Sequence, residues 1–194
     1  MRNAAVTDGQ PLSSSQVRWP TLSSALFAPP CPSYPSASKL LIDMPDTSAH
    51  LRTIRSDELP NILALYRHLH PSDPELSVGP DLEALWQKIC NDPLLHYFGA
   101  ELDGTLVSTC TLAIIPNLTR SARPYGLVEN VVTHPEFRRR GIGTALLRFT
   151  LRFAWDQGCY KVMLLTGRHD PATLRFYEQA GFQAGVKTGF IALP

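Results

Sequence analysis

Two kinds of hydrophobic pattern alternate along the chain from residue 50 onward. Apolar or alternating runs of strand length cover residues 50–55, 94–102, 105–115, 128–132 and 160–165. The second and third runs flank Asp103-Gly104, a dipeptide typical of a β-hairpin turn. The fourth run ends before Pro135, which has no N–H to donate to a sheet. We therefore predict five strands, with one hairpin between the second and the third.

Other stretches repeat apolar residues at helical spacing. They cover residues 59–70, 81–91, 142–157 and 170–180. Ser56 or Asp57 is the expected N-cap of the first helix, and Gly158 is the expected C-cap of the third. We expect the tail, residues 182–193, to add one or two short strands.

The order of these elements predicts a mixed α/β fold, in which helices cover a sheet. The strands on either side of the third helix are joined by that helix alone. We therefore expect them to be parallel, with a right-handed crossover. The hairpin strands before them are antiparallel.

Residues 1–48 have no periodic apolar face and are rich in serine and proline. Such a composition is typical of a disordered segment. We predict a leader over residues 1–48 and a folded domain over 49–194. A targeting segment, or a start of the natural chain at Met44, is an alternative reading of the leader.

Charge and composition exclude several function classes. The net charge is +1 and the pI is near 7.7, so there is no general basic field for nucleic acid. No apolar run reaches the roughly 18 residues that span a bilayer. We expect a soluble, cytoplasmic protein without a membrane partner. The four cysteines and six histidines lack the spacing of metal ligands, so no metal is assigned.

A basic turn with two glycines follows the strand that ends at Thr133. It reads Arg138-Arg139-Arg140-Gly141-Ile142-Gly143 and leads directly into the third helix. The first N–H groups of a helix have no internal partners, so a strand, turn and helix in this order make a ready site for phosphate. The third glycine of a dinucleotide fingerprint is replaced by Leu146, and the lysine of a Walker loop is absent. Neither of those nucleotide sites fits.

The turn instead matches the pattern Arg/Gln-x-x-Gly-x-Gly/Ala. Downstream, residues 174–182 read Leu-Arg-Phe-Tyr-Glu-Gln-Ala-Gly-Phe. With both segments, residues 50–193 resemble the GNAT acetyltransferase superfamily. The resemblance implies a mostly antiparallel sheet with helices on both faces and two central parallel strands that splay apart. It also implies acetyl-CoA as co-substrate and transfer of its acetyl group to a primary amine.

The resemblance further implies which residues hold the cofactor. The turn would bind the pyrophosphate, and the strand before it would bond the pantetheine amides as an added strand does. The expected contacts are Val131, Val132, Thr133, Arg138, Arg139, Arg140, Gly141, Ile142, Gly143, Thr144 and Asp170. Val131 and Val132 are equally compatible with an ordinary core strand. Many members of the family have asparagine where this chain has Asp170, and the alternative for Asp170 is a helix N-cap.

Two residues are candidates for the chemistry. Glu129 is an acidic residue in an otherwise apolar strand beside the expected thioester, where it could take a proton from the amine. Tyr177 resembles the family tyrosine that donates a proton to the leaving thiolate. The N–H of Val132 would polarise the carbonyl. The alternatives are a solvated or salt-bridged Glu129 and a core position for Tyr177.

The acceptor is expected to be a small-molecule amine. Asn117, Arg120, Tyr125 and Asn130 are candidates to line its site, although loop arginines such as Arg120 and Arg123 are often simply solvated. Residues 129–132 are also similar to the corresponding strand of glucosamine-phosphate N-acetyltransferases. A protein N-acetyltransferase and an acyl-CoA-binding module without catalysis are the competing hypotheses, and a homodimer is left open.

Overall fold

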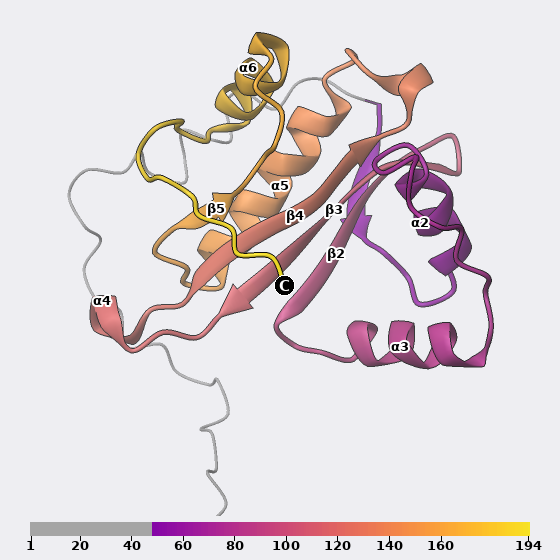
Figure 1. The fold of residues 1–194 in the computed structure, drawn as a ribbon, viewed down its shortest axis with the longest axis horizontal. Coiled ribbons are helices and arrows are strands. Elements are labelled where there is room, and N and C mark those ends of the chain that lie inside the picture. The colour runs from indigo at the N-terminus through magenta and orange to yellow at the C-terminus, as the bar shows by residue number, and fades with distance from the viewer. Residues whose placement is uncertain (1–47) are drawn as a thin grey trace, which may run out of the picture. The chain divides into compact units, whose positions relative to one another are not determined.

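A computed structural model describes residues 48–194 of the chain (Figure 1), and the structural statements below concern these residues. The predicted leader, residues 1–48, lies outside the described residues except for Ser48.

A five-stranded sheet runs through this part of the chain in the order β1-β2-β3-β4-β5. The strands are β1 (His50–Thr53), β2 (Leu95–Leu102), β3 (Thr105–Ile115), β4 (Tyr125–Thr133) and β5 (Val162–Leu164). Neighbouring strands are antiparallel, except β4 and β5, which are parallel. The mixed, mostly antiparallel sheet and its parallel pair are as predicted.

Helices cover both faces of this sheet (Figure 1). They are α2 (Leu59–Tyr66), α3 (Pro80–Cys90), α5 (Ile142–Asp156) and α6 (Pro171–Ala180). On one face, Leu146 and Leu147 of α5 pack with Phe98, Leu112 and other strand residues. The other face is covered by α2 and α3. None of the helices within residues 48–194 combines the length and apolar character that crossing a bilayer requires.

On the second face, Ile62 and Leu65 of α2 pack with Trp86 of α3 and with Leu106 of β3. This core also contains Val132 of β4, which is 4% exposed. The two cores therefore take residues from the same strands, one on each side of the pleat.

Three local predictions need correction. Neither Ser56 nor Asp57 caps α2; the N-cap position is Glu58, whose carboxylate is engaged by arginines instead. The first helix ends at Tyr66, one turn earlier than its apolar spacing suggested. Residues 181–194 form no strand, and Gly185 within them has φ 74°, which interrupts an extended chain.

A buried ion pair joins the first strand to the first helix. The Arg52 guanidinium donates two hydrogen bonds of 2.7 Å to the Glu58 carboxylate and also contacts Glu101 of β2. The side chains of Arg52 and Glu58 are only 14% and 5% exposed. Glu58 also accepts a 2.7 Å hydrogen bond from the Arg55 N–H. The hydrogen bonds from the Arg52 guanidinium contribute most to lowering the pKa of Glu58 below its ordinary value, and the bond from the Arg55 N–H lowers it further.

We predict that Glu58→Gln lowers the free energy of unfolding by about 2–3 kcal/mol at neutral pH, because it removes a buried partner of a charged hydrogen-bonded pair. Since the pKa of Glu58 is lower in the folded state, the unfolded chain binds the extra proton, and stability falls as the pH drops below about 4.5. Denaturant unfolding between pH 3 and 7 measures both effects. The variant should lose part of this acid dependence; an unchanged pH profile would show that the pair does not stabilise the fold.

Candidate active site

The pairing between β4 and β5 covers only the first part of β4. The register joins Gly126 to Val162 and Val128 to Leu164, and no pair follows. β4 continues to Thr133 without a partner on that side. The two parallel strands thus separate beyond Val128, and the main-chain edge of β4 that faces β5 is open from there on.

A β-bulge at Asn130 lies where the strands separate. Thr109 pairs with Val132 but Thr111 pairs with Glu129, so Cys110 faces two residues of β4. Asn130 has φ 54°, an uncommon value for a residue other than glycine. The extra residue reverses the side-chain alternation, so that Val128 packs in the α5 core and Val132 in the α2 core.

Hydroxyl groups of β3 satisfy carbonyls around this bulge. Thr111 Oγ1 donates to the Glu129 carbonyl at 3.0 Å, and Ser108 Oγ donates to the Val132 carbonyl at 2.8 Å. Ser108 is fully buried and also lies 2.8 Å from Thr133 Oγ1. β3 therefore holds the bulged segment in place through side chains as well as through the ladder.

One hydrogen bond shows to which side the main-chain N–H and C=O groups of β4 point. The N–H of His134 bonds to the Val107 carbonyl of β3 at 2.9 Å. Because main-chain groups alternate along a strand, the groups of Val132 also face β3, whereas those of Val131 and Thr133 face the opening. The expectation that the Val132 N–H polarises the thioester is therefore wrong: that group lies on the β3 side of the strand.

The basic turn forms a cradle of free N–H groups. Gly141 has φ 76° at the N-cap of α5, and the first bond of the helix runs from the Ala145 N–H to the Gly141 carbonyl at 2.9 Å. Within residues 48–194, the N–H groups of Ile142, Gly143 and Thr144 have no acceptor. A cluster of free donors at the positive end of a 15-residue helix favours an anion.

Gly143 is required by close packing. A Cβ at this position would lie 3.0 Å from Thr133 Oγ1 and 3.2 Å from the Phe176 ring. The start of α5 therefore lies so close to the end of β4 and to the side of α6 that a side chain at this position would push its neighbours by a few tenths of an ångström. This approach brings the three elements of the cradle together.

The three arginines of the turn make different contacts. Arg138 Nε donates to the Thr133 carbonyl at 2.9 Å, so this side chain fixes the turn against the strand. The Arg140 guanidinium lies 5.1 Å from the centre of the Phe137 ring. Neither these two nor Arg139 pairs with a carboxylate of residues 48–194. Their charge is available to an anionic ligand.

The pKa of Tyr177 is set by its burial and by the polar and charged groups near it. Burial raises the pKa of Tyr177, and the negative charge of Glu129 raises it further, while Thr166 and Arg168 lower it. Tyr177 also contacts Phe176, with ring centres 4.9 Å apart. Glu129 is exposed and has no ion pair among the described residues, so the expectation of a costly charge inside an apolar strand is wrong for the free protein.

Asp170 occupies the N-cap of α6. Its carboxylate accepts hydrogen bonds from the N–H and the hydroxyl of Thr173 at 2.9 and 2.8 Å. These bonds lower the pKa of Asp170. The capping alternative accounts for this residue, and a contact with the cofactor stays a prediction.

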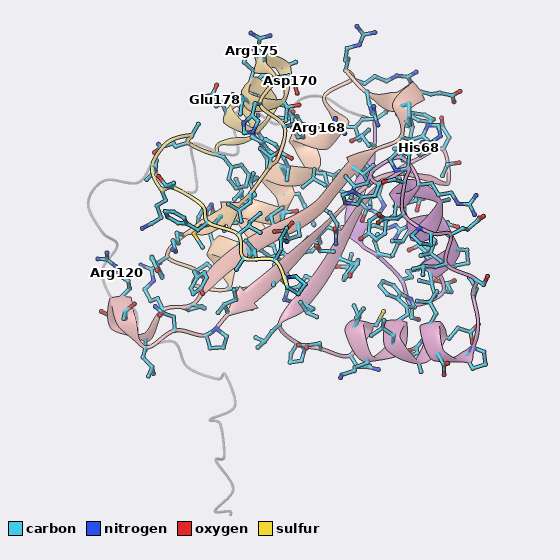
Figure 2. All side chains as sticks on the ribbon, viewed as in Figure 1. His68, Arg120, Arg168, Asp170, Arg175 and Glu178 are labelled. Atoms are coloured by element: carbon cyan, nitrogen blue, oxygen red, sulfur yellow. The ribbon has the colours of Figure 1, made fainter. Side chains whose placement is uncertain are left out.

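The expected acceptor residues do not gather at one place. Asn117 Nδ2 donates to Thr119 and to the Arg123 carbonyl within its own loop, which includes the short turn α4 (Thr119–Ala122). Figure 2 shows Arg120 on this loop, far from Arg168 and Asp170. Tyr125 at the start of β4 lies under the Lys161 ammonium, 5.0 Å from its ring centre. Only Asn130 lies beside Glu129.

Sequence reasoning missed several polar residues near this centre. Ser108 and Thr111 hold the bulge, and Thr166 and Arg168 influence Tyr177. The signal was present for β3, because Ser108, Thr109 and Thr111 interrupt an apolar run that is otherwise fit for a core strand. Within residues 48–194, no three histidine, cysteine or acidic side chains come together as metal ligands do.

Known proteins are similar to this chain in sequence and in fold. The model of a family described as the acetyltransferase (GNAT) family matches residues 61–182. Glucosamine 6-phosphate N-acetyltransferase of Trypanosoma brucei brucei is 31% identical over 142 residues, which are 69% of this chain and 88% of that protein.

Solved structures have the same fold. A protein of Agrobacterium tumefaciens strain C58, proposed to be an acetyltransferase, is 47% identical, with a TM-score of 0.71 over 75% of this chain and 99% of that one. The fold is also that of AAC(6')-Iy in complex with the bisubstrate analogue CoA-S-monomethyl-acetylneamine. That chain has a TM-score of 0.62 and 20% identity over 76% of this chain and 99% of its own.

We predict that Gly143→Val weakens acetyl-CoA binding about tenfold, because the added side chain must displace Thr133 or Phe176 and shift the start of α5. Isothermal titration with acetyl-CoA measures the change. Gly79→Val is the matched control, since a Cβ at Gly79 meets nothing within 4 Å and its extended backbone suits a β-branched residue. Equal binding by both variants would argue against a cofactor site at this turn.

Proposed function

Because this chain belongs to the acetyltransferase (GNAT) family and is an acetyl-CoA-dependent N-acetyltransferase, we propose that it transfers the acetyl group to the primary amine of a small molecule. Transfer takes place by direct attack of the amine while both substrates are bound. The observation that carries this proposal is the opening between β4 and β5 beyond Val128, next to the exposed Glu129, together with the free N–H groups at the start of α5.

The cofactor would bind along the open edge of β4. The free N–H groups of Ile142, Gly143 and Thr144 suit the pyrophosphate, with charge from Arg139 and Arg140. The main-chain groups of Val131 and Thr133 face the opening and suit the amides of the pantetheine arm. The Thr133 carbonyl already accepts a hydrogen bond from Arg138. The N–H and the carbonyl of Val131 are therefore the more available main-chain groups for the pantetheine arm. The thioester would then lie near the bulge.

Glu129 acts as the general base in this proposal. An alkyl ammonium has a pKa near 10.4 and must lose a proton before it can attack the thioester. An exposed carboxylate without an ion pair can accept that proton, directly or through a water molecule. Glu129 releases this first proton to solvent. The new C–N bond then forms as the C–S bond breaks, and the second proton of the amine nitrogen passes to the regenerated Glu129 carboxylate.

Tyr177 acts as the general acid. Burial and the nearby Glu129 charge raise the pKa of its phenol, so the group stays protonated at neutral pH. It can then donate its proton to the sulfur as the thiolate leaves, and solvent restores the phenol. The CoA product departs as a thiol.

The size of the acceptor is inferred from relatives. The Trypanosoma protein is described as acting on glucosamine 6-phosphate, a small amine, and the similarity extends over 88% of its length. A protein N-acetyltransferase is the second candidate among enzymes. A homodimeric assembly remains a prediction from the sequence alone.

We predict that Glu129→Gln and Tyr177→Phe each lower turnover about 100-fold, since each removes a group that moves a proton in the transition state. Both should bind acetyl-CoA within about twofold of the wild type, because neither supplies the pyrophosphate site. Thiol release with a panel of amino sugars, polyamines, amino acids and peptides measures turnover, and calorimetry measures binding.

The same panel separates the candidate functions. Turnover with peptides but with no small amine would favour the protein acetyltransferase. If acetyl-CoA binds but no amine releases thiol, the chain is a binding module. If both variants retain full turnover, the assigned base and acid are wrong.

A further inference from the structure

The Glu129 side chain lies on the face of β4 that points away from α5. Val128 packs in the α5 core, so its neighbours Leu127 and Glu129 point to the opposite face of the sheet. Residues that are paired across strands share a face, and the register places Thr111 opposite Glu129 and Ala113 opposite Leu127. The face that carries the Glu129 carboxylate therefore continues onto β3.

Next to Glu129 this face is apolar and uncovered. We call it the open face and define it by six residues that are in register on four strands: Leu95, Ala113, Ile115, Tyr125, Leu127 and Met163. Each of them is partly exposed, and within residues 48–194 none of them belongs to an apolar core. Figure 1 shows the reason, because α2 and α3 lie beside β2 and do not reach β5.

The tail of the chain does not bury the open face. It passes close to Leu165, directly after β5, since a Cβ at Gly189 would lie 2.6 Å from the Leu165 side chain. Leu165 is nevertheless 53% exposed, and Phe190 and Ile191 of the tail are 89% and 78% exposed. These side chains add apolar surface next to β5. An extended apolar surface with a polar rim is typical of a binding site.

Opposite charges mark the two ends of the open face. Glu129 is exposed at one end. At the other end, the Lys161 ammonium lies 5.0 and 5.5 Å from the ring centres of Tyr125 and Tyr160. Neither charge has an ion pair among the residues that the structure describes. Tyr125 precedes Glu129 by four residues, which is about 13 Å along a strand.

This charge pattern orients an amine on the open face. The Glu129 carboxylate attracts an ammonium group, whereas the Lys161 ammonium repels it. The nitrogen of an acceptor therefore lies at Glu129, and the rest of the molecule lies over the apolar residues.

We propose that the acceptor is a primary monoamine with an apolar body, such as an alkylamine or an arylalkylamine, and that the open face binds this body. The inference rests on the proposed function and names the substrate class of the same site. Leu127 and Met163, which are paired in the register, form the part of the open face that the body of a short amine contacts. A second ammonium group on the acceptor would lie toward Lys161, so diamines and polyamines are disfavoured.

The test compares hexylamine with 2-(2-aminoethoxy)ethanol, a primary amine with the same number of non-hydrogen atoms and a polar body. A third acceptor, 1,6-diaminohexane, carries a second ammonium group. The readout is kcat/KM by thiol release from acetyl-CoA. We expect the wild type to prefer hexylamine over the polar amine about tenfold, because the polar amine loses the hydration of its ether and hydroxyl groups on an apolar surface.

Variants of the open face test the contact itself. Met163→Gln and Leu127→Thr each place a polar group on it and should lower the preference for hexylamine to about threefold or less. Leu85→Gln is the matched control, since Leu85 is 51% exposed on α3, outside the open face, and the ratio should stay as in the wild type. Lys161→Gln should raise the use of 1,6-diaminohexane relative to hexylamine about threefold, because it removes the repelling charge.

Turnover of glucosamine without turnover of hexylamine would overturn the inference and leave the proposed function standing. Equal use of hexylamine and the polar amine by the wild type would also overturn it. So would an unchanged ratio in both open-face variants with an altered molar mass by light scattering, since the face would then bind a second copy of the chain. If acetyl-CoA binds but no amine releases thiol, the proposed function itself is wrong. Circular dichroism checks that each variant is folded.

Discussion

The single extra residue in β4 determines on which face of the sheet the residues after it pack. With Asn130 inserted opposite Cys110, the strand changes the face to which its side chains point, and Val128 and Val132 enter different cores. The bulge also lies just past the last β4–β5 pair, Val128 with Leu164. One local irregularity therefore anchors both helical layers and opens the main-chain edge on which a cofactor can lie.

Such an insertion requires support, because a positive φ at an asparagine is an unfavourable conformation. The support comes from β3, whose Thr111 and Ser108 hydroxyls bond the carbonyls of Glu129 and Val132. The far end of the segment is fixed by Arg138 on the Thr133 carbonyl and by the close approach of Gly143. The polar residues of the strand and the glycine of the turn thus stabilise the same distortion from its two ends.

Much of the fold was predictable from sequence because its signals are local. The hairpin at Asp103-Gly104, the end of β4 before Pro135 and the glycine that starts α5 each follow from the residue type. The bulge was not predictable, since residues 125–133 read as an ordinary strand and only the register with β3 reveals the insertion. For the same reason the expected role of the Val132 N–H at the thioester could not be checked from sequence. Glu58 stands at the N-cap position of α2, yet its carboxylate pairs with Arg52, six residues earlier, and does not cap the helix. Asn117 and Arg120 precede β4 in sequence, yet Asn117 bonds within its own loop, and Arg123 of that loop bonds to the carbonyls of Gly158 and Cys159 after α5.

The cysteines of the described residues bear on whether the acetyl group passes through the protein. Cys110 faces the bulge in the register, but its side chain is fully buried, lies 3.2 Å from the Thr150 hydroxyl, and has a pKa raised by burial to about 12. At neutral pH its thiolate would amount to about one part in 100,000, and the thiolate is the form that attacks a thioester. Cys159 is also buried, with its pKa raised. Cys90 is exposed, but it is the last residue of α3, which packs against β2, and the pKa of its thiol is also raised by burial. An acetylated cysteine intermediate therefore has no suitable residue among these three, which is consistent with the direct attack by the amine that we propose.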